Sequence, residues 1–475
     1  MKRTISATFL WMWVFFAIPS ITGAAEVTFT EAWQMLLQNN EGLAADRAGV
    51  ERAGLLVEAN KGWRLPTLDL TGSYTRLDDP VTLGPSQLLS SMPAGAGLEH
   101  IFEDLGSLLS IPSGAVDQAL TSTLMDDDVW NASLRALWPL FTGGRISAAV
   151  GIAEAQHQEA EFRLLMQEQV KFEELAKYYF GVVLAGRVLE TRTEVQDGLA
   201  QHLDHAVKLE EQGQVARVER LQAAASFDRA KVERRKAERD LEIATLALTR
   251  IVRSETLVQP VSGLFTNTQL PPEESFVDST LAQYPGLGVL DAKRRQANGL
   301  IKVNQGDYYP GVFVFGNYTL YEGDDLAGQM APDWLVGVGV NIPLVSPTGR
   351  RNRVGAARSA VVQVDYLRSQ AQHDLQLLVE KTYREALQAL EEFEGLATSL
   401  ELARENVRLR EIAFSQGLST SLDVIDGQLF LAGIKTQRWV ASYRYVLSLA
   451  RLLAISGGKN DFSSFQNSNS IGMGS

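Results

Sequence analysis

The stretch Trp138-Pro-Leu-Phe-Thr-Gly-Gly-Arg145 returns later in the sequence as Ile342-Pro-Leu-Val-Ser-Pro-Thr-Gly-Arg350. A second motif, Glu211-Gln-Gly-Gln-Val215, returns as Ser415-Gln-Gly-Leu-Ser419. Pro139 and Pro343 are 204 positions apart, and so are Gly213 and Gly417. The two halves therefore keep register between these motifs. This duplication predicts two tandem structural repeats.

The first 25 residues are typical of a secretory signal peptide. Lys2 and Arg3 precede an apolar run from Ile5 to Ile18, and Gly23-Ala-Ala25 supplies small residues for cleavage. An N-terminal membrane anchor is the alternative, but the run is shorter than the roughly 20 apolar residues that a spanning helix needs. We therefore expect residues 1–25 to be removed from an exported chain.

The composition argues against several classes of protein. The chain has no cysteine, which excludes a disulfide framework and a lipid-modified N-terminal cysteine. Its net charge of −13 argues against a nucleic-acid partner. We expect no cofactor, no metal site and no enzyme activity. An exported chain of 475 residues without cysteine fits a protein of the bacterial envelope.

Four segments alternate apolar and polar residues with a period of two, as strands with two different faces do. They cover residues 66–77, 129–141, 310–321 and 333–345 approximately. Each is long enough for a tilted strand to cross an outer membrane. A half-buried sheet in a soluble protein shows the same alternation, but the signal peptide and the arrangement as two hairpins favour a membrane. Aromatic residues near the strand ends are predicted to form interfacial belts: Tyr74, Trp130, Trp138, Tyr309 and Trp334.

The four predicted strands require a barrel that is shared between copies of the chain. Four strands cannot close a barrel, and open strand edges in lipid would leave backbone groups without hydrogen bonds. Two copies would give a barrel whose interior is filled by side chains. Three copies, with twelve strands, form the smallest barrel with an open pore.

Long helical patterns follow each pair of strands. In residues 145–212 and 350–416, apolar residues recur at steps of three and four. At ~1.5 Å per residue each helix would be on the order of 100 Å long, which predicts coiled-coil packing into an α-helical barrel. Each pattern ends at a glycine, Gly213 or Gly417, where the chain can reverse.

Shorter helices complete each half. We predict helices at Arg217–Ile251 and Ser421–Ile455 after the glycines, and at Thr30–Lys61 and Phe276–Gly306 before the first strand of each half. The fold class is therefore an α+β membrane protein.

These elements predict the domain organisation. A first repeat covers residues 26–258, a linker 259–273 and a second repeat 274–456, followed by a disordered polar tail at 457–475.

The two halves differ in the loop between their strands. Pro66 and Pro139 are 73 positions apart, whereas Pro310 and Pro343 are 33 apart, so the first hairpin carries 40 extra residues. They fall in a loop at 78–128 that we expect outside the cell. Apolar residues between Leu98 and Leu109 predict a short amphipathic helix, which either packs over the barrel mouth or decorates the surface.

The segment Phe414-Ser-Gln-Gly-Leu-Ser-Thr-Ser-Leu-Asp-Val-Ile-Asp426 resembles the periplasmic hairpin motif of TolC-like outer-membrane efflux proteins. The resemblance covers essentially the whole mature chain. It implies a homotrimer with a twelve-stranded barrel and a helical tunnel in the periplasm. It also implies partners, namely a periplasmic adaptor protein and an inner-membrane transporter, and contact with outer-membrane lipid.

The resemblance implies that Asp423 and Asp426 line the periplasmic entrance, and Glu219 matches the acidic position of the first hairpin. Carboxylates from three copies would form a ring that favours cations. Asp423 has an alternative role, because Thr420-Ser-Leu-Asp423 has the spacing of a capping box.

The sequence departs from the family at the latch that closes the entrance. In the family this latch consists of a tyrosine and an arginine, which align with Phe414 and Ser419. Phenylalanine has no hydroxyl and serine has no charge. The latch of the family therefore cannot be assigned to this chain. We hypothesise that Arg217 or Arg220 replaces it by pairing with Asp423 of a neighbouring copy.

Turn residues of both hairpins are candidates for docking to the adaptor: Gly213, Val215, Gly417 and Leu418. Reversal of the chain is the simpler role for the two glycines. His202 and His205, three positions apart on a helix, are predicted to lie on a solvated face and not to bind a metal.

The sequence therefore predicts a passive outer-membrane duct of a tripartite efflux or type I secretion system. The alternative is a trimeric coiled-coil adhesin or envelope scaffold. Such adhesins place one membrane segment at the C-terminus, whereas the hairpins here are internal and occur twice.

Overall fold

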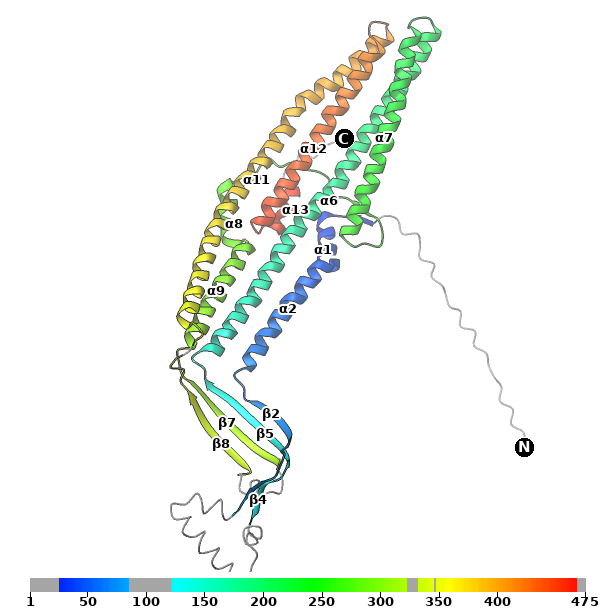
Figure 1. Cartoon of the computed structure of the whole chain (residues 1–475). Coiled ribbons are helices and arrows are strands. Elements are labelled where there is room, and N and C mark those ends of the chain that lie inside the picture. Colours follow the sequence, from blue (N-terminus) through cyan, green and yellow to red (C-terminus); the bar gives the residue numbers. More distant parts are fainter. Residues whose placement is uncertain (1–24, 85–120, 323–331, 346, 468–475) are drawn as a thin grey trace, which may run out of the picture. The chain divides into compact units, whose positions relative to one another are not determined.

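The computed structural model describes residues 25–84, 121–322, 332–345 and 347–467. The predicted signal peptide, apart from Ala25, and the predicted loop helix at 98–109 lie outside these residues. The chain divides into two compact units (Figure 1). A strand unit comprises residues 51–158 and 292–365, and a helical unit comprises residues 25–50, 159–291 and the chain from 366 onward.

The first half of the chain contains both strands and helices. In chain order these are β1 (Ala25–Val27), α1 (Phe29–Asn39), α2 (Glu41–Gly62), β2 (Thr67–Arg76), β3 (Val81–Leu83), β4 (Ser122–Met125), β5 (Asp128–Phe141), α6 (Arg145–Glu211), α7 (Arg217–Ile251) and β6 (Val258–Pro260).

In the described part of the second half, two helices are again followed by two strands and two longer helices. It contains α8 (Glu273–Gln283), α9 (Pro285–Gly306), β7 (Gly311–Glu322), β8 (Trp334–Asn341), α11 (Arg350–Ser415), α12 (Ser421–Ile455), the 3-10 helix η1 (Lys459–Asp461) and α13 (Phe462–Asn467).

The strand unit is built on a four-stranded antiparallel sheet with the order β2-β5-β7-β8. The alternation seen in the sequence gives the sheet two different faces. Leu70 pairs with Leu134 on the apolar face, and Asp69 pairs with Arg135 on the other face. The apolar side chains of β8 are exposed to solvent in the single chain: Trp334, Val336, Val338 and Val340. The sheet therefore carries an uncovered apolar face, and β2 and β8 form its two open edges.

The alternation of β7 is less regular because two phenylalanines lie on the polar face. Phe313 pairs with Gly339 and Phe315 with Gly337 across the β7–β8 ladder. The two phenyl rings fill the space above these glycines, within 2.4 Å and 2.6 Å of where a Cβ would lie. The rings thus cover the strand positions that have no side chain.

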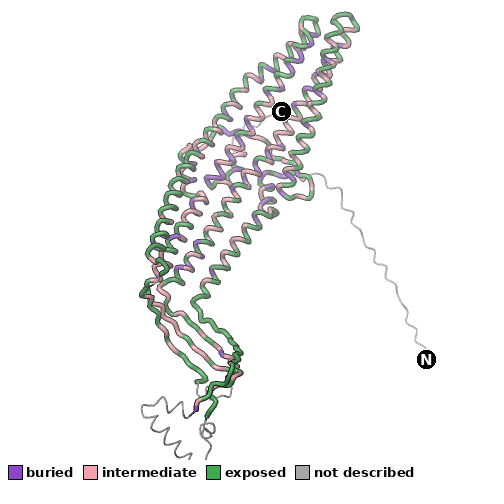
Figure 2. The backbone as a smooth tube through the Cα atoms, in the orientation of Figure 1, coloured by how far each residue is buried: buried purple, intermediate pink, exposed green. Residues whose placement is uncertain are grey.

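Buried positions gather in the helical unit (Figure 2). The side chains at these positions form a core of aromatic and aliphatic residues. Phe29 of α1 packs against Phe172 and Phe180 of α6, with ring centroids 5.4 Å apart in each pair. The hydroxyl of Tyr179 donates to the Val27 carbonyl at 2.7 Å and accepts from the Ser262 amide at 2.9 Å. These bonds join the two short parallel strands β1 and β6 to the core.

The prediction of a disordered tail from residue 457 is wrong for residues 459–467. Phe462 is 2% exposed, and its ring centroid lies 4.7 Å from that of Phe29. Lys459 forms an ion pair with Glu168 at 3.6 Å. Burial of one aromatic side chain therefore orders a segment whose composition is mostly polar. Residues 468–475 lie outside the described part of the chain.

Two predicted helices are each divided in two. The first helix breaks at Asn40. The side-chain oxygen of Asn40 accepts a hydrogen bond from the Leu43 amide at 3.0 Å and so caps the start of α2. The second breaks at Tyr284, because Pro285 starts α9 and cannot continue the hydrogen-bond pattern of α8. The predicted helices at Arg217–Ile251 and Ser421–Ile455 have the observed bounds. Among the described residues, the helices are too polar or too short to span a membrane.

Candidate functional site

The helical hairpins α6–α7 and α11–α12 end in two similar turns (Figure 1). Gly213 and Gly417 have φ values of +72° and +71°, in the left-handed region that only glycine adopts without strain. In each turn the residue after the glycine donates its amide to a carbonyl five residues earlier, Gln214 to Leu209 and Leu418 to Ala413. Both glycines therefore serve the reversal of the chain.

The predicted docking residues differ in their exposure. Gly213 and Gly417 are exposed, and Leu418 is 78% exposed. Val215 instead packs against the cluster formed by Ala206, Ala223, Phe414 and Val424. Leu418 is thus an exposed apolar side chain of the tip, whereas Val215 packs inside it.

The first turn of α12 is a capping box. Asp423 donates its amide to the Thr420 hydroxyl at 3.3 Å, and its carboxylate accepts the Thr420 amide at 3.0 Å. Hydrogen bonds from Thr420, foremost that from its hydroxyl, lower the pKa of Asp423 to about 2. The capping role predicted for Asp423 is therefore confirmed, and the group stays charged above pH 3.

Asp423 is also paired within its own hairpin. Arg410 of α11 donates to the Asp423 carboxylate at 3.0 Å and to its backbone carbonyl at 2.8 Å. Asp426, one turn further along α12, is exposed and forms no ion pair with another described residue. The two carboxylates that the sequence treats alike therefore differ, since Asp423 is neutralised locally and Asp426 is free to act on an ion outside the chain.

Glu219 joins the two hairpins. Its carboxylate accepts the backbone amide of Ser421 at 2.7 Å, and its carbonyl oxygen accepts the Ser421 hydroxyl at 3.1 Å. An amide at the N-terminus of a helix has no partner within that helix, so Glu219 supplies a cap to α12 from across the hairpin pair. The acidic position that sequence comparison marks for a gate thus holds the tips together in this chain.

The prediction that His202 lies on a solvated face is wrong. The residue is 3% exposed, its Nε2 lies 2.7 Å from the Ser421 Oγ, and its ring centroid lies 4.5 Å from that of Phe414. Because the Ser421 proton is donated to Glu219, His202 donates from Nε2. Burial and then the neighbouring His205 lower the pKa of His202 to about 4, so the ring is neutral at pH 7.

Sequence reasoning missed Ser421 and Arg410. Ser421 has an ordinary position next to a cap, and its contacts come from two other helices more than 200 positions away. The proposed substitute for the latch has partners in the same chain, because Arg220 pairs with Glu210. Pairing of Arg217 or Arg220 with a neighbouring copy stays a prediction.

The predicted belt residues lie at both ends of the sheet. Tyr74 faces Trp130 across the β2–β5 ladder with ring centroids 4.6 Å apart, and Trp334 pairs with Tyr318 near the same end. Trp138 and Tyr309 lie near the opposite end, where the Trp138 indole donates to the Arg64 carbonyl at 3.0 Å. Two aromatic rows are typical of a sheet that spans a membrane, but the contact of these residues with lipid stays a prediction.

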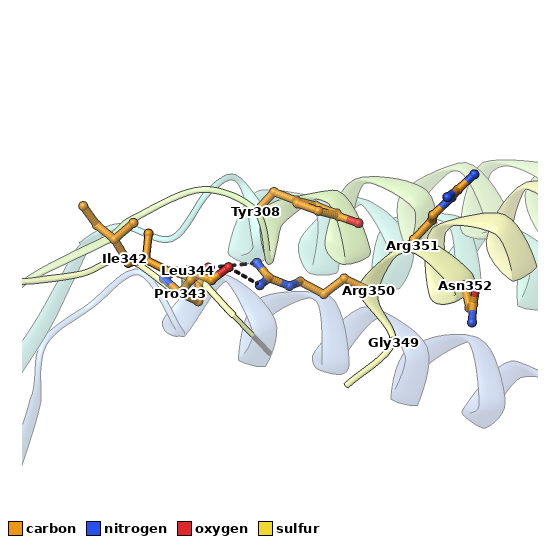
Figure 3. Close-up of a pocket in the computed structure, with 8 residues that line it drawn as sticks. All are labelled: Tyr308, Ile342, Pro343, Leu344, Gly349, Arg350, Arg351 and Asn352. Atoms are coloured by element: carbon orange, nitrogen blue, oxygen red, sulfur yellow. Dashed lines mark hydrogen bonds between the residues drawn. The ribbon is translucent and has the colours of Figure 1, made fainter. Parts of the chain in front are cut away.

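A basic pocket lies where β8 leads into α11 (Figure 3). Arg350 points back toward the strand and donates to the carbonyls of Pro343 at 3.0 Å and Asp307 at 2.9 Å. Its guanidinium carbon lies 5.1 Å from the centre of the Tyr308 ring. Arg350 therefore closes the turn, whereas Arg351 points away from Pro343 and Leu344 in the same view. In the described residues no group of three or more His, Asp or Glu is arranged to hold a metal.

Comparison with known proteins agrees with this architecture. A family model for outer membrane efflux protein matches residues 32–252 and 276–458. No curated protein matches the sequence.

Solved structures of low sequence identity share the fold. CusC, whose structures were solved in a study of folding and transmembrane channel formation, aligns with a TM-score of 0.72 at 15% identity, covering 92% of this chain and 96% of that chain. VceC of Vibrio cholerae gives 0.70 at 15% identity, with 91% and 96% covered. The MtrE outer membrane channel of Neisseria gonorrhoeae, solved in its open state, gives 0.68 at 18% identity, with 91% and 89% covered.

Proposed function

Because the chain belongs to the outer membrane efflux protein family, we propose that three copies form a passive duct through which substrates leave the periplasm. The predicted membership of the family of TolC-like outer-membrane efflux proteins is confirmed by the family match. The protein is an outer-membrane transport protein with its helical part in the periplasm, and its family is one of channels and not of enzymes.

The observation that carries the proposal is the four-stranded sheet with an apolar face and two open edges. In lipid the unpaired amides and carbonyls of β2 and β8 cannot be satisfied by water. Pairing of β8 with β2 of the next copy removes both edges, and three copies give a barrel of twelve strands. The helices α6, α7, α11 and α12 of each copy then continue as a helical barrel.

An adaptor protein and an inner-membrane transporter complete the proposed pathway. At the tip of α11–α12, the reversal at Gly417 is followed by the exposed apolar side chain of Leu418. The turn at Gly213 forms the tip of the other hairpin. We place the adaptor contact there. The two matched stretches, residues 32–252 and 276–458, support the division into two repeats.

The free carboxylate of Asp426 is the proposed determinant of ion selectivity at the periplasmic entrance. Three copies bring three such groups around one axis, where their negative charge attracts cations. Asp423 and Glu219 hold the fold of the tips and contribute less, because Asp423 faces Arg410 and Glu219 faces the α12 terminus.

A liposome experiment separates the duct from an envelope scaffold. Purified oligomer is reconstituted into vesicles, and the rate of swelling in isotonic solutions of small sugars is measured. A duct predicts swelling that depends on sugar size, and native mass spectrometry of the same sample gives three copies. Vesicles that swell no faster than empty ones would favour the scaffold.

A further inference from the structure

A cavity of about 520 Å³ lies between the end of α9 and the first turns of α11. It is lined by Gln305, Tyr308, Tyr309, Arg351, Val354, Gly355 and Arg358. A neighbouring cavity of about 470 Å³ shares Tyr308 and Arg351 with it and extends to Ile342 and Leu344 (Figure 3). The pair of cavities therefore runs from two arginines on α11 to the end of the apolar face of the sheet.

The two arginines of the larger cavity have no counter-charge in the described chain. Arg351 and Arg358 lie seven positions apart, on one side of α11, and neither forms an ion pair or a hydrogen bond with a described residue. The acid at this junction, Asp307, is already occupied by Arg145 at 3.2 Å and by Arg353 at 3.7 Å. Two guanidinium groups beside two tyrosine side chains suit a phosphate, because a guanidinium binds its oxygens through two parallel hydrogen bonds.

Exposed aliphatic side chains lie on the other side of the same junction. Ile342, Leu344 and Val345 are 58%, 86% and 93% exposed. Ile342 continues the alternation of Val336, Val338 and Val340, so it lies at the end of the face that we assign to lipid. A ligand that fills both cavities must combine an anionic head with an apolar body.

The corresponding junction of the first repeat lacks this arrangement. There Arg145 is followed by Ile146 and Ser147, and Arg145 is paired with Asp307. The duplication of the chain thus provides an internal comparison. The unpaired arginines belong to one junction only and are not a requirement of the strand-to-helix turn.

We propose that this pocket binds one anionic glycerophospholipid per chain, with the phosphate between Arg351 and Arg358 and the acyl chains along Ile342 and Leu344. The lipid belongs to the periplasmic leaflet, since the pocket lies at the end of the strands from which the periplasmic helices begin. It would fix the depth of the barrel in the membrane at a defined side chain, in addition to the aromatic rows.

Native mass spectrometry of the intact oligomer in detergent tests the proposal. The protein is titrated with phosphatidylglycerol or with phosphatidylcholine, which differ in net charge but not in acyl chains. We expect phosphatidylglycerol to bind more tightly, and the variant R351Q/R358Q, which removes two charge-assisted contacts, to lose at least about ten-fold in affinity. The variant R351K/R358K keeps the charge without the planar fork and should fall between the two.

The matched control is R384Q/R408Q, which removes the same charge from the same helix far from the cavity. Arg408 pairs with Glu405 at 2.5 Å, and Arg384 lies 3.9 Å from Glu273. The control should bind phosphatidylglycerol as the unmodified protein does. Thermal unfolding of all variants shows whether the oligomer remains intact.

Three outcomes would overturn the proposal. Equal affinity for the two lipids removes the role of charge, and an unchanged affinity of R351Q/R358Q removes the role of these arginines. Displacement of the lipid by an equal concentration of inorganic phosphate would assign the pocket to a soluble anion. The test does not depend on conduction, so it stands or falls separately from the proposed duct.

Discussion

At the scale of single residues, the hairpin tips are held by one serine, the first residue of α12, which residues of α6 and α7 contact. Ser421 donates its amide and its hydroxyl to Glu219 of α7, and it accepts a hydrogen bond from His202 of α6. A carboxylate, a neutral imidazole and a helix terminus thus meet at a buried point. The motif around Asp423 could be read from the sequence because a capping box is local. The role of Ser421 could not, because its partners are distant in the chain.

Replacement of Glu219 by alanine should loosen the tips. It leaves the Ser421 amide without its acceptor, and loss of such a cap costs about 1 kcal/mol, or roughly five-fold faster local exchange. Hydrogen exchange of the amides at the start of α12 measures this. Glu211→Ala removes the same side chain from an exposed position at the end of α6 and serves as the control. Equal exchange in the two variants would show that Glu219 does not cap α12.

The burial of His202 predicts that the stability of the hairpin tips depends on pH. The pKa of His202 is about 4 in the folded chain, whereas that of an unperturbed histidine is 6.5. Between these pH values the unfolded chain therefore binds more protons than the folded chain. The stabilisation contributed by neutral His202 is complete above pH 6.5 and is lost as the pH falls toward 4. His202→Gln keeps a donor for Ser421 but does not titrate. Hydrogen exchange at the tips, corrected for its intrinsic pH dependence, should accelerate below pH 6 in the unmodified protein and less in the variant. The same acceleration in both would contradict the role of His202.

At the scale of elements, turn glycines set where strands give way to helices. Gly143 and Gly144, between β5 and α6, have φ values of +63° and +79°. A Cβ at Gly143 would lie 2.5 Å from the backbone oxygen of Gly306, whereas a Cβ at Gly144 meets no atom within 4 Å. The end of α9 thus packs directly on the turn that follows β5.

These two glycines provide a matched pair of substitutions. Gly144→Ala should cost about 1 kcal/mol through the left-handed backbone alone. Gly143→Ala adds a clash with backbone that cannot move aside, for a total of about 2–4 kcal/mol. The temperature at which the oligomer dissociates on an electrophoresis gel measures the difference. A loss of equal size in both variants would contradict the close contact with Gly306.

Element boundaries were predictable where the signal is local. Helices α7 and α12 have the bounds read from the sequence because Gly213, Gly417 and Thr420 mark where they begin. The breaks at Asn40 and Tyr284 were missed because apolar periodicity continues across them. The order in residues 459–467 was missed because a single buried side chain, Phe462, outweighs a polar composition.

At the scale of the whole molecule, the fold explains how one chain can serve both a membrane and the periplasm. The apolar face of the sheet and its open edges predict a barrel of several copies. Family membership follows from the match over both halves of the chain.

Single-channel recording of the purified oligomer in a planar bilayer tests the central claim most directly. We expect stable conductance with a preference for K⁺ over Cl⁻, measured as the reversal potential in a salt gradient. Asp426→Asn should reduce this preference. The control Asp204→Asn changes an exposed carboxylate that pairs with Lys208, and it should leave the preference unchanged. Absence of conductance, or a cation preference that is the same in Asp426→Asn, would contradict the account of a duct with a carboxylate entrance.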